Sequence, residues 1–346
     1  MSGPGGEGAG TARGRASVLG AGSWGTTLAV HLAELGWSVA LWDGDTANLD
    51  RMRTERENRK YLPGIALPES LEVVSDLASA LGEARLVTWA VPSVALREVA
   101  RAARPHLPPA SLEACATKGL EPAAAGARPR RMSQVLVEEL GERRRALLVG
   151  PSHAEEVCRG VPTSLVAAAE KLAWAEEVQR AFFAPRFRVY AQDDLAGVEF
   201  GSALKNVIAL AAGVSDGLGY GDNTKGALLT RGLAEMSRLG EALGGRRETF
   251  FGLSGMGDLI TTAISRHSRN RRVGEEIARG RTLEEALAGL GQVAEGVSTA
   301  PAARMLAQAH AVDVPITREV CALLYEGKPA TAALADLLAR DPKREA

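Results

Sequence analysis

Short apolar runs alternate with amphipathic segments along the first half of the chain. The runs at 85–91 and 146–149 have the length of buried strands, and the segments at 96–103 and 132–140 show helical periodicity. Strands that alternate with helices are typical of βαβ units. This half is therefore predicted to form a parallel sheet covered by helices.

The pattern changes near residue 192, where strand-like runs give way almost entirely to helical periodicity. The segment 193–218 is apolar or small around its whole circumference, which predicts a buried helix. A length of 346 residues is also long for one hydrophobic core. We therefore expect a doubly wound α/β domain over 15–192 and an all-α domain over 193–341. The glycine-rich residues 1–14 are expected to be a disordered tail.

Local signals set the boundaries of smaller elements. Ser75 is expected to cap a helix that ends near Gly82. The segment 61–68 contains two prolines and a glycine, which predicts a loop. The alanine-rich segment 121–127 is expected to be a loop as well.

The stretch 18–29 carries the strongest local motif. Two apolar residues precede Gly20, Gly22 and Gly25, and helical periodicity follows. At this spacing the first glycine allows a tight turn and the second lets the backbone approach a pyrophosphate. The third lets the helix pack close to the strand. The first domain is therefore predicted to be Rossmann-like and to bind a dinucleotide, with Ser23 and Trp24 in the phosphate turn. A glycine turn that only packs a helix on a sheet is the alternative.

Composition and charge exclude several classes of partner. The net charge is −1, so no global basic field favours nucleic acid or an anionic membrane surface. The longest apolar runs are much shorter than a bilayer span, and the first residues lack the apolar core of a signal peptide. The cysteines and histidines show no disulfide or metal-ligand spacing, so no metal is expected. These features favour a cytoplasmic protein with reduced thiols.

Several polar residues directly follow predicted strands, at the edge where open α/β sheets bind ligands. Lys118 follows the strand at 112–117, and Gly150, Ser152 and Ala154 follow the strand at 146–149. Together they offer one site an ammonium group, a hydroxyl and free backbone donors. For Lys118, a solvated position in a loop is the alternative.

Lys205 stands inside the segment predicted to be a buried helix. A lysine is rarely buried unless it is paired. Burial lowers the pKa of an amine and a nearby carboxylate raises it, so a balance near neutrality would make this lysine a usable proton donor or acceptor. The alternative is a side chain that reaches water from the edge of the helix.

Further candidate residues follow in the second half of the chain. Asp258 precedes Thr262 by four residues, so both would share a helix face. Ser268 could cap a helix that begins with Arg269, and an arginine beside helix-start N–H groups suits a phosphate. An exposed basic stripe is the alternative. Glu295 precedes another helix, where it could contact a cofactor or stabilise the helix start.

Taken in order, these motifs resemble the NAD(P)-dependent glycerol-3-phosphate dehydrogenases of the bacterial type. The matches extend over essentially the whole chain after the tail, and several are longer than a general nucleotide-binding signature. The runs are Gly-Ala-Gly-Ser-Trp-Gly-Thr at 20–26, Arg-Glu-Asn-Arg-Lys-Tyr-Leu-Pro-Gly-Ile at 56–65, Ala-Val-Pro-Ser at 90–93, Ala-Thr-Lys-Gly-Leu-Glu at 116–121, Gly-Pro-Ser-His-Ala-Glu-Glu-Val at 150–157, Leu-Lys-Asn-Val-Ile-Ala at 204–209, Asp-Gly-Leu-Gly at 216–219, Gly-Asp-Leu at 257–259, Ser-Arg-Asn-Arg-Arg at 268–272 and Val-Ala-Glu-Gly-Val at 293–297.

The resemblance implies an active site between a Rossmann domain and a helical domain. The implied reaction is the reversible reduction of dihydroxyacetone phosphate by NAD(P)H to sn-glycerol 3-phosphate, which feeds glycerophospholipid synthesis. The implied catalytic residues are Lys205, Lys118 and Asp258. The implied substrate-binding residues are Lys118, Gly150, Ser152, Lys205, Asp258, Ser268, Arg269 and Asn270. The implied cofactor-binding residues are Gly20, Gly22, Ser23, Trp24, Gly25, Asp43, Lys118, Ala154, Arg269, Val293 and Glu295. A homodimer is expected from the family.

One position departs from the pattern of the family. Asp43 ends the second strand, where an acid that binds a ribose is expected. Many relatives carry Arg or His directly after this strand, and the matching residue here is Gly44. An acid at this point would bond a free ribose diol and repel a 2′-phosphate, which predicts a preference for NADH over NADPH. Asp43 could instead cap the next helix, and Arg51 and Arg53 could still meet a phosphate.

Two other functions are alternatives to glycerol-3-phosphate dehydrogenase activity. A related two-domain dehydrogenase, of the 6-phosphogluconate or 3-hydroxyacid type, would share the fold but lack these runs together. A non-catalytic protein that senses a dinucleotide would have no need of Lys118, Lys205 and Asp258 together, and all three are present.

Overall fold

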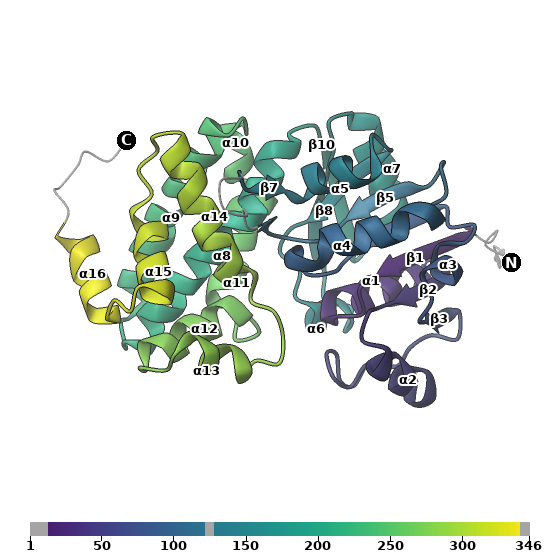
Figure 1. The fold of residues 1–346 in the computed structure, drawn as a ribbon, viewed down its shortest axis with the longest axis horizontal. Coiled ribbons are helices and arrows are strands. Elements are labelled where there is room, and N and C mark those ends of the chain that lie inside the picture. The colour runs from purple at the N-terminus through teal and green to yellow at the C-terminus, as the bar shows by residue number, and fades with distance from the viewer. Residues whose placement is uncertain (1–12, 122–127, 340–346) are drawn as a thin grey trace, which may run out of the picture.

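The computed structural model describes residues 13–121 and 128–339. It consists of a region built on a sheet and a region built of helices, which lie side by side in Figure 1. Most of the tail predicted at 1–14 and of the loop predicted at 121–127 lies outside the described residues.

The first region is a mostly parallel α/β sheet with eight strands in the order β10-β9-β8-β5-β4-β1-β2-β3. The strands are β1 Arg15–Leu19, β2 Ser38–Trp42, β3 Leu71–Val74, β4 Leu86–Trp89, β5 Leu112–Cys115, β8 Arg145–Val149, β9 Thr163–Ala168 and β10 Phe187–Gln192. The helices are α1 Ser23–Glu34, α2 Thr46–Glu55, α3 Leu77–Leu81, α4 Ser93–Ala103, α5 Met132–Leu140, α6 Ala154–Val157 and α7 Leu172–Phe182, with a 3₁₀ turn, η1, at Arg104–His106. A small antiparallel pair, β6 Leu120–Glu121 and β7 Arg130–Arg131, stands apart from the main sheet.

Both faces of the main sheet are buried. Val18 and Leu41 pack into one apolar cluster, whereas their neighbours Leu19 and Trp42 pack into another. Adjacent residues of a strand point to opposite faces, so strands buried on both sides become continuous apolar runs. This explains why the strands were recognisable as short apolar runs in the sequence.

The predicted α/β sheet is confirmed, but one edge of it departs from the parallel arrangement. β9 pairs with β8 in the antiparallel direction, and β10 follows β9 in parallel. The connection between β8 and β9 contains only α6, a helix of four residues. A helix of that length advances about 6 Å, too little to carry the chain back along the sheet. The chain therefore re-enters the sheet at the edge where β8 ends.

Two further boundaries differ from the prediction. Asp76, rather than Ser75, caps α3, because its carboxylate accepts a hydrogen bond from the backbone N–H of Ser79. The helix after β4 begins at Ser93 rather than near residue 96, because Pro92 has the fixed φ that suits a helix start. The loop predicted at 61–68 is confirmed.

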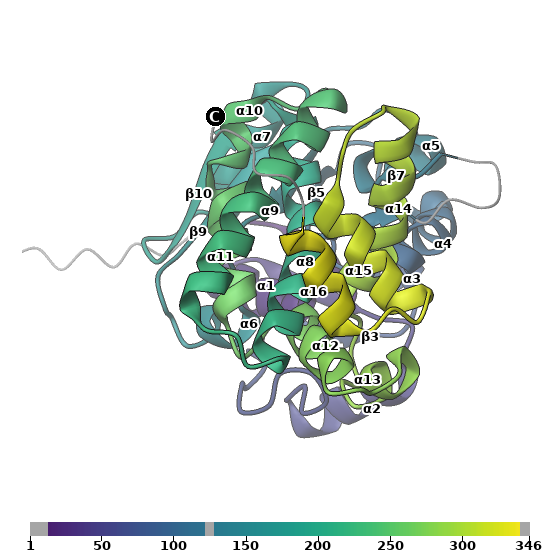
Figure 2. The same ribbon diagram turned by 90° about the vertical axis from the view of Figure 1, so that its left-hand side faces the viewer.

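The second region is helical and is built around α8, Leu195–Gly217. The remaining elements are α9 Asp222–Ala242, α10 Arg247–Phe250, a π-helical turn η2 Leu253–Gly257, α11 Asp258–Ile264, α12 Arg269–Ala278, α13 Leu283–Ala288, α14 Glu295–Ala309, α15 Pro315–Tyr325 and α16 Ala330–Leu338. Figure 2 shows α8 behind the other helices, and it packs against α9, α11, α12 and α14.

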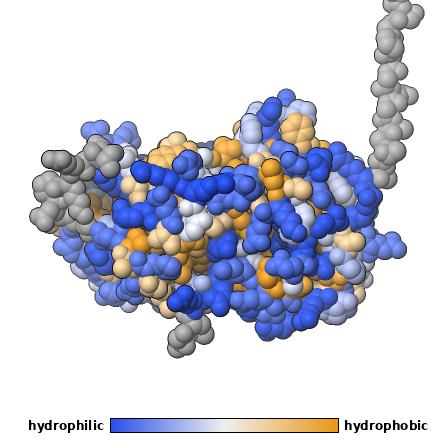
Figure 3. Space-filling view, turned by 90° about the horizontal axis from the view of Figure 1, so that it is seen from above, coloured by the Kyte–Doolittle hydropathy of each residue, from blue (hydrophilic) through white to orange (hydrophobic). Residues whose placement is uncertain are grey.

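By length and composition α8 could cross a membrane, but 83% of its most apolar window is buried inside the fold. It is the core helix of the second region, as the apolar segment at 193–218 predicted. The face shown in Figure 3 is mostly hydrophilic, with apolar residues in small groups between polar ones. This is the ordinary surface of a protein in contact with water.

Candidate active site

A cleft of about 650 Å³ lies where the sheet region meets the helical region. On one side it is lined by residues that follow the carboxyl ends of β1, β4 and β5, and on the other by residues of α8, α11 and α12. This is the edge at which open α/β sheets bind ligands.

The glycine turn after β1 has the geometry that its spacing predicted. Gly20 has a φ of +112°, and a Cβ there would lie 2.7 Å from the backbone of Ala90. A Cβ on Gly25 would lie 1.8 Å from the carbonyl oxygen of Gly20, so only glycine lets α1 pack this close. Gly22 lines the cleft, and a Cβ on it would meet no atom within 4 Å.

The turn and the start of α1 form a cradle that fits the pyrophosphate of a dinucleotide. The N-terminal residue before α1, Gly22, provides no side-chain cap, and the first turn of α1 holds no acidic residue. The backbone N–H groups of this turn are therefore available to an anion. Ser23 and Trp24 also line the cleft.

Asp43 lies on the rim of the same cleft and is half-buried. Its carboxylate accepts hydrogen bonds from the backbone N–H of Ala21 at 2.5 Å and from that of Asp45 at 2.9 Å. The cap of α2 is Asp45, so the alternative role for Asp43 as that cap was wrong. The glycine turn and the strand end are thus joined through one carboxylate.

Two lysines from different regions share a single buried carboxylate. The Nζ of Lys205, near the middle of α8, donates to Oδ1 of Asp258 at 2.7 Å and to Oγ1 of Thr262 at 2.6 Å. The Nζ of Lys118, after β5, donates to Oδ2 of Asp258 at 2.9 Å and to the carbonyl oxygen of Gly150 at 2.8 Å. Both alternatives for these lysines, a solvated loop side chain and one that reaches water from the helix edge, were therefore wrong.

The electrostatics of this cluster tune both partners. The pKa of Lys205 is lowered to about 8, chiefly by burial. The charge of Lys118 also lowers this pKa, whereas the charge of Asp258 raises it. Burial alone would raise the pKa of Asp258, but the two ammonium groups outweigh burial and hold that pKa below its usual value. An amine with a pKa near 8 can both give and take a proton close to neutral pH.

The N-terminus of α12 faces the same cleft. Ser268 caps this helix and accepts a hydrogen bond from the backbone N–H of Arg271 at 3.2 Å. The guanidinium of Arg269 makes no hydrogen bond to any residue in 13–121 or 128–339, and it lines the cleft. Asn270 is held in place, because its side chain donates to Oδ1 of Asn206 at 2.9 Å. Free guanidinium donors beside a helix start suit a phosphate.

Glu295 joins the two regions across the cleft. Its carboxylate accepts hydrogen bonds from the backbone N–H of Ser93, at 2.9 Å, and from the hydroxyl of Ser93. Burial raises the pKa of Glu295, and the bonds from Ser93 oppose that rise. Glu295 thus stabilises the start of α4, a helix of the other region, and not only the start of its own helix.

Most of the predicted site residues lie in the cleft. Two predicted residues do not line it: Gly25 packs α1 against the turn, and Gly150 offers its carbonyl to Lys118. The residues that line it are Gly20, Gly22, Ser23, Trp24, Asp43, Lys118, Ser152, Ala154, Lys205, Asp258, Ser268, Arg269, Asn270, Val293 and Glu295.

Two histidines of the cleft were not singled out from the sequence. His153 and His267 come from different regions, and their ring centroids lie 6.0 Å apart. Each is adjacent to a predicted site residue, Ser152 or Ser268, and that adjacency was the only available signal.

Two family models match the chain and together cover most of it. The model of the NAD-dependent glycerol-3-phosphate dehydrogenase N-terminus matches residues 15–175, and that of the C-terminus matches residues 194–335. These matches argue against both other functions considered above, a related two-domain dehydrogenase and a non-catalytic sensor.

Individual relatives agree with the family models over the full length. The glycerol-3-phosphate dehydrogenase [NAD(P)+] of Moorella thermoacetica is 51% identical over 329 residues, which are 95% of this chain and 97% of that one. The protein of the same name from Pelotomaculum thermopropionicum is 48% identical over 335 residues, 96% of this chain and 95% of that one. A crystal structure of glycerol-3-phosphate dehydrogenase from Coxiella burnetii superposes with a TM-score of 0.90 at 38% identity, covering 94% of this chain and 99% of that one. The chain therefore belongs to the NAD(P)-dependent glycerol-3-phosphate dehydrogenase family.

Proposed function

We propose that this protein interconverts dihydroxyacetone phosphate and sn-glycerol 3-phosphate with NAD(P) as coenzyme. The observation that supports it best is the pair of lysines on one buried carboxylate, in the cleft that also holds the glycine turn. A ketone reduction needs a proton donor and positive charge near the developing alkoxide, and this cluster can supply both. The product would feed the synthesis of glycerophospholipids.

The coenzyme would lie along the glycine turn. Gly22 leaves room for the pyrophosphate, and the N–H groups at the start of α1 would bind it. When bound, the coenzyme supplies or accepts a hydride. The other proposed contacts are Gly20, Ser23, Trp24, Asp43, Lys118, Ala154, Arg269, Val293 and Glu295, with Gly25 supporting the turn from behind.

In this proposal Lys205 donates the proton to the carbonyl oxygen during reduction and accepts it during oxidation. Lys118 places a second positive charge near the same oxygen. Asp258 positions both ammonium groups, and its charge raises the pKa of Lys205. Closure of the two regions over the substrate would exclude water from this cluster.

The phosphate of the substrate would be held at the start of α12. Arg269 offers a guanidinium with free donors, and Ser268 and Asn270 flank it. Ser152 reaches the cleft from the opposite wall, and Gly150 acts through its carbonyl contact with Lys118.

The function is tested by following the oxidation of NADH in the presence of dihydroxyacetone phosphate. The Lys205→Ala variant is expected to lose at least about a thousandfold in kcat while still binding NADH, because the proton donor and its charge are both removed. Lys171→Ala, at an exposed lysine before α7, is the matched control and should keep the activity of the native protein. Near-normal turnover by Lys205→Ala would refute its role as the acid/base.

We further propose that NADH is preferred over NADPH. The carboxylate of Asp43 lies on the rim of the cleft, where it would bond a ribose diol and repel a 2′-phosphate. Arg51 and Arg53 are engaged elsewhere, with Asn48 and with the carbonyl of Val73. Comparison of kcat/KM for the two coenzymes tests this, and we expect NADH to be favoured by at least about tenfold. A large advantage for NADPH would overturn the proposal.

The two proposed functions, coenzyme binding and catalysis, belong to two successive parts of the chain. We propose a dinucleotide-binding domain at 15–192 and a substrate-binding and catalytic domain at 193–341. The homodimer and the cytoplasmic location remain predictions, and sedimentation of the purified protein would measure the first.

A further inference from the structure

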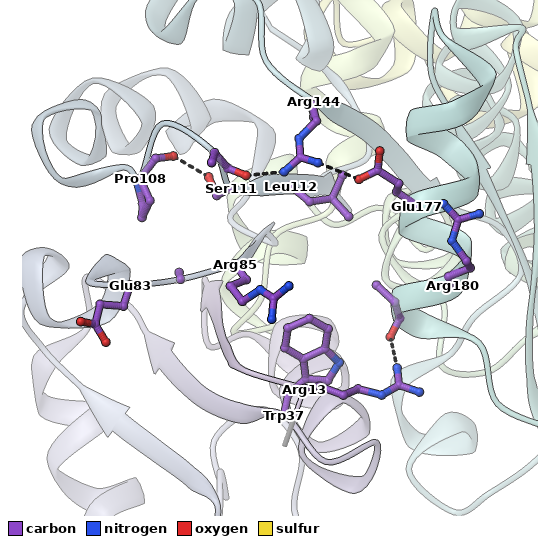
Figure 4. Close-up of a pocket in the computed structure, with 13 residues that line it drawn as sticks. Arg13, Trp37, Glu83, Arg85, Pro108, Ser111, Leu112, Arg144, Glu177 and Arg180 are labelled. Carbon is purple, nitrogen blue, oxygen red and sulfur yellow. Dashed lines mark hydrogen bonds and ion pairs between the residues drawn. The ribbon is translucent and has the colours of Figure 1, made fainter. Parts of the chain in front are cut away.

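A second cavity, of about 600 Å³, opens at the opposite edge of the sheet from the cleft. It lies where β1, β4 and β5 begin, and Figure 4 shows the side chains that surround it. Within the described part of the chain, it has no lining residue in common with the cleft. Nothing in the proposed reaction uses this cavity.

Its lining carries an excess of positive charge. Four arginines, Arg13, Arg85, Arg144 and Arg180, surround it, against two glutamates. Arg144 is neutralised, because its guanidinium pairs with Glu177 at 3.0 Å. Apart from this pair, the lining carries three guanidinium groups and the carboxylate of Glu83.

Most of the N–H donors of Arg13, Arg85 and Arg180 make no hydrogen bond to the described residues. The side chain of Arg85 makes no hydrogen bond or ion pair with any residue in the two described ranges. Among the described residues, Arg180 has only a long contact, 3.9 Å, with Glu176 on its own helix, and Arg13 gives one hydrogen bond, 3.3 Å, to the carbonyl of Ala181. A guanidinium carries five N–H donors in a fork that matches carboxylate and phosphate groups.

A buried donor at the same place also lacks a partner. The side chain of Trp37 is only 9% exposed, and its indole N–H meets no acceptor among the described residues. In Figure 4 the ring lies next to Arg85, with its nitrogen edge turned toward the side of the cavity where Arg13 lies. Buried polar groups are almost always hydrogen-bonded, so this N–H needs an acceptor, which an ordered water or a ligand head group could supply.

Apart from Glu83 and the hydroxyl of Ser111, the rest of the lining is apolar. The side chains of Leu112, Ala84 and Ala181 contribute to it, together with the ring of Trp37. A free inorganic anion would leave this surface in contact with water, whereas a ligand with an apolar body would cover it.

We propose that this cavity binds a small amphipathic anion, with an apolar body and a phosphate or carboxylate head. The head is held by Arg85, Arg180 and Arg13 and accepts the indole N–H of Trp37. The body covers the apolar lining beside β5. The site is separate from the active-site cleft and is formed by the sheet region alone.

Titration calorimetry of the full-length protein with octyl phosphate and with octanoate tests the proposal. One of the two, or both, should bind with one site per chain, whereas octanol and inorganic phosphate should bind at least about tenfold more weakly, since each lacks half of the ligand. Failure of both amphipathic anions to bind would overturn the proposal.

Substitutions of the lining residues test whether the amphipathic anion binds in this cavity. The double variant Arg85→Gln/Arg180→Gln should weaken binding at least tenfold, and Trp37→Phe, which removes only the N–H donor, about three- to tenfold. Arg247→Gln, at an exposed arginine of α10, is the matched control and should bind as the native protein does. Because the two substituted arginines are exposed, thermal unfolding should remain near that of the native chain.

A second comparison separates this site from the active site. Arg269→Gln removes the guanidinium proposed to hold the substrate phosphate, so it should leave the binding of octyl phosphate or octanoate unchanged. If Arg269→Gln abolished the binding and the double variant did not, the anion would be bound in the cleft and the proposal would be wrong.

Discussion

Asp258 holds two ammonium groups at once, Lys205 at 2.7 Å and Lys118 at 2.9 Å. In the proposed mechanism Lys205 donates the proton that reduction of the ketone consumes, so its protonated form would be the active one in that direction. With the pKa of Lys205 at about 8, kcat/KM for reduction should fall as the pH rises through about 8. In the direction of oxidation kcat/KM should rise over the same range, because the neutral amine is then required. Initial rates in both directions across pH 6–10 measure this. Parallel profiles in the two directions would contradict it.

Asp258→Asn should move this inflection to lower pH. The charge of Asp258 raises the pKa of Lys205, so its loss should lower that pKa by about one unit or more while leaving a polar side chain of the same size. Asp216→Asn is the control, because Asp216 pairs with Lys225 and Arg271 outside the cleft. An inflection that stayed at the native pH in Asp258→Asn would show that the carboxylate does not tune the lysine.

Part of this residue arrangement could be read from the sequence. The four-residue spacing of Asp258 and Thr262 predicted a shared helix face, which is confirmed by the 3.2 Å contact between Oγ1 and Oδ1. The position of Lys118 after a strand placed it at the correct edge of the sheet. That both lysines reach the same carboxylate could not be predicted from local patterns, because Lys118 and Asp258 lie in different regions that only the tertiary fold brings together.

Among the elements, the junction of β1 and α1 depends on Gly25. A Cβ at this position would lie 1.8 Å from the carbonyl oxygen of Gly20, so Gly25→Ala must push the helix away from the turn. We expect a loss of roughly 2–4 kcal/mol in the free energy of unfolding, measured with urea, together with weaker binding of NADH.

Gly22→Ala is the matched comparison, because its Cβ would meet nothing within 4 Å. The free energy of unfolding should change by less than about 1 kcal/mol, whereas the affinity for NADH should fall at least about tenfold, since the methyl group would occupy the approach to the pyrophosphate. Equal effects of the two substitutions on stability would show that the packing of the turn does not depend on Gly25.

The elements were the most predictable level of the structure. Apolar runs identified the strands because the sheet is buried on both faces, and caps such as Ser268 identified helix starts. The reversed direction of β9 was missed, because an apolar run is the same in either direction. The restricted φ of proline suits the helix starts at Pro92 and Pro315, although the start of α4 after Pro92 was predicted three residues too late.

At the scale of the whole molecule, three carboxylates among the described residues join the sheet region to the helices. Asp258 accepts from Lys118, Glu295 accepts from Ser93, and Glu199 accepts from Ser133 and Arg131. The first two line the cleft, so their removal would alter both chemistry and stability. Glu199 lies outside the cleft, so its substitution tests the contact between the regions by itself.

Glu199 is 2% exposed and accepts hydrogen bonds from the backbone N–H of Ser133 at 2.7 Å, from its hydroxyl at 2.6 Å and from Arg131 at 3.0 Å. Glu199→Ala leaves these donors buried without an acceptor, which costs about 3–5 kcal/mol and should lower Tm by roughly 5–10 °C. Glu138 lies on α5, the helix that also holds Ser133, and makes exposed ion pairs with Arg97 and Arg130. Glu138→Ala, the control, should cost less than about 1 kcal/mol. Because the lost bonds join the two regions, calorimetry of Glu199→Ala should also show a broader transition, in which the helical region unfolds before the sheet or after it. Equal shifts in Tm for the two variants would mean that the buried contact of Glu199 stabilises the protein no more than a surface ion pair does.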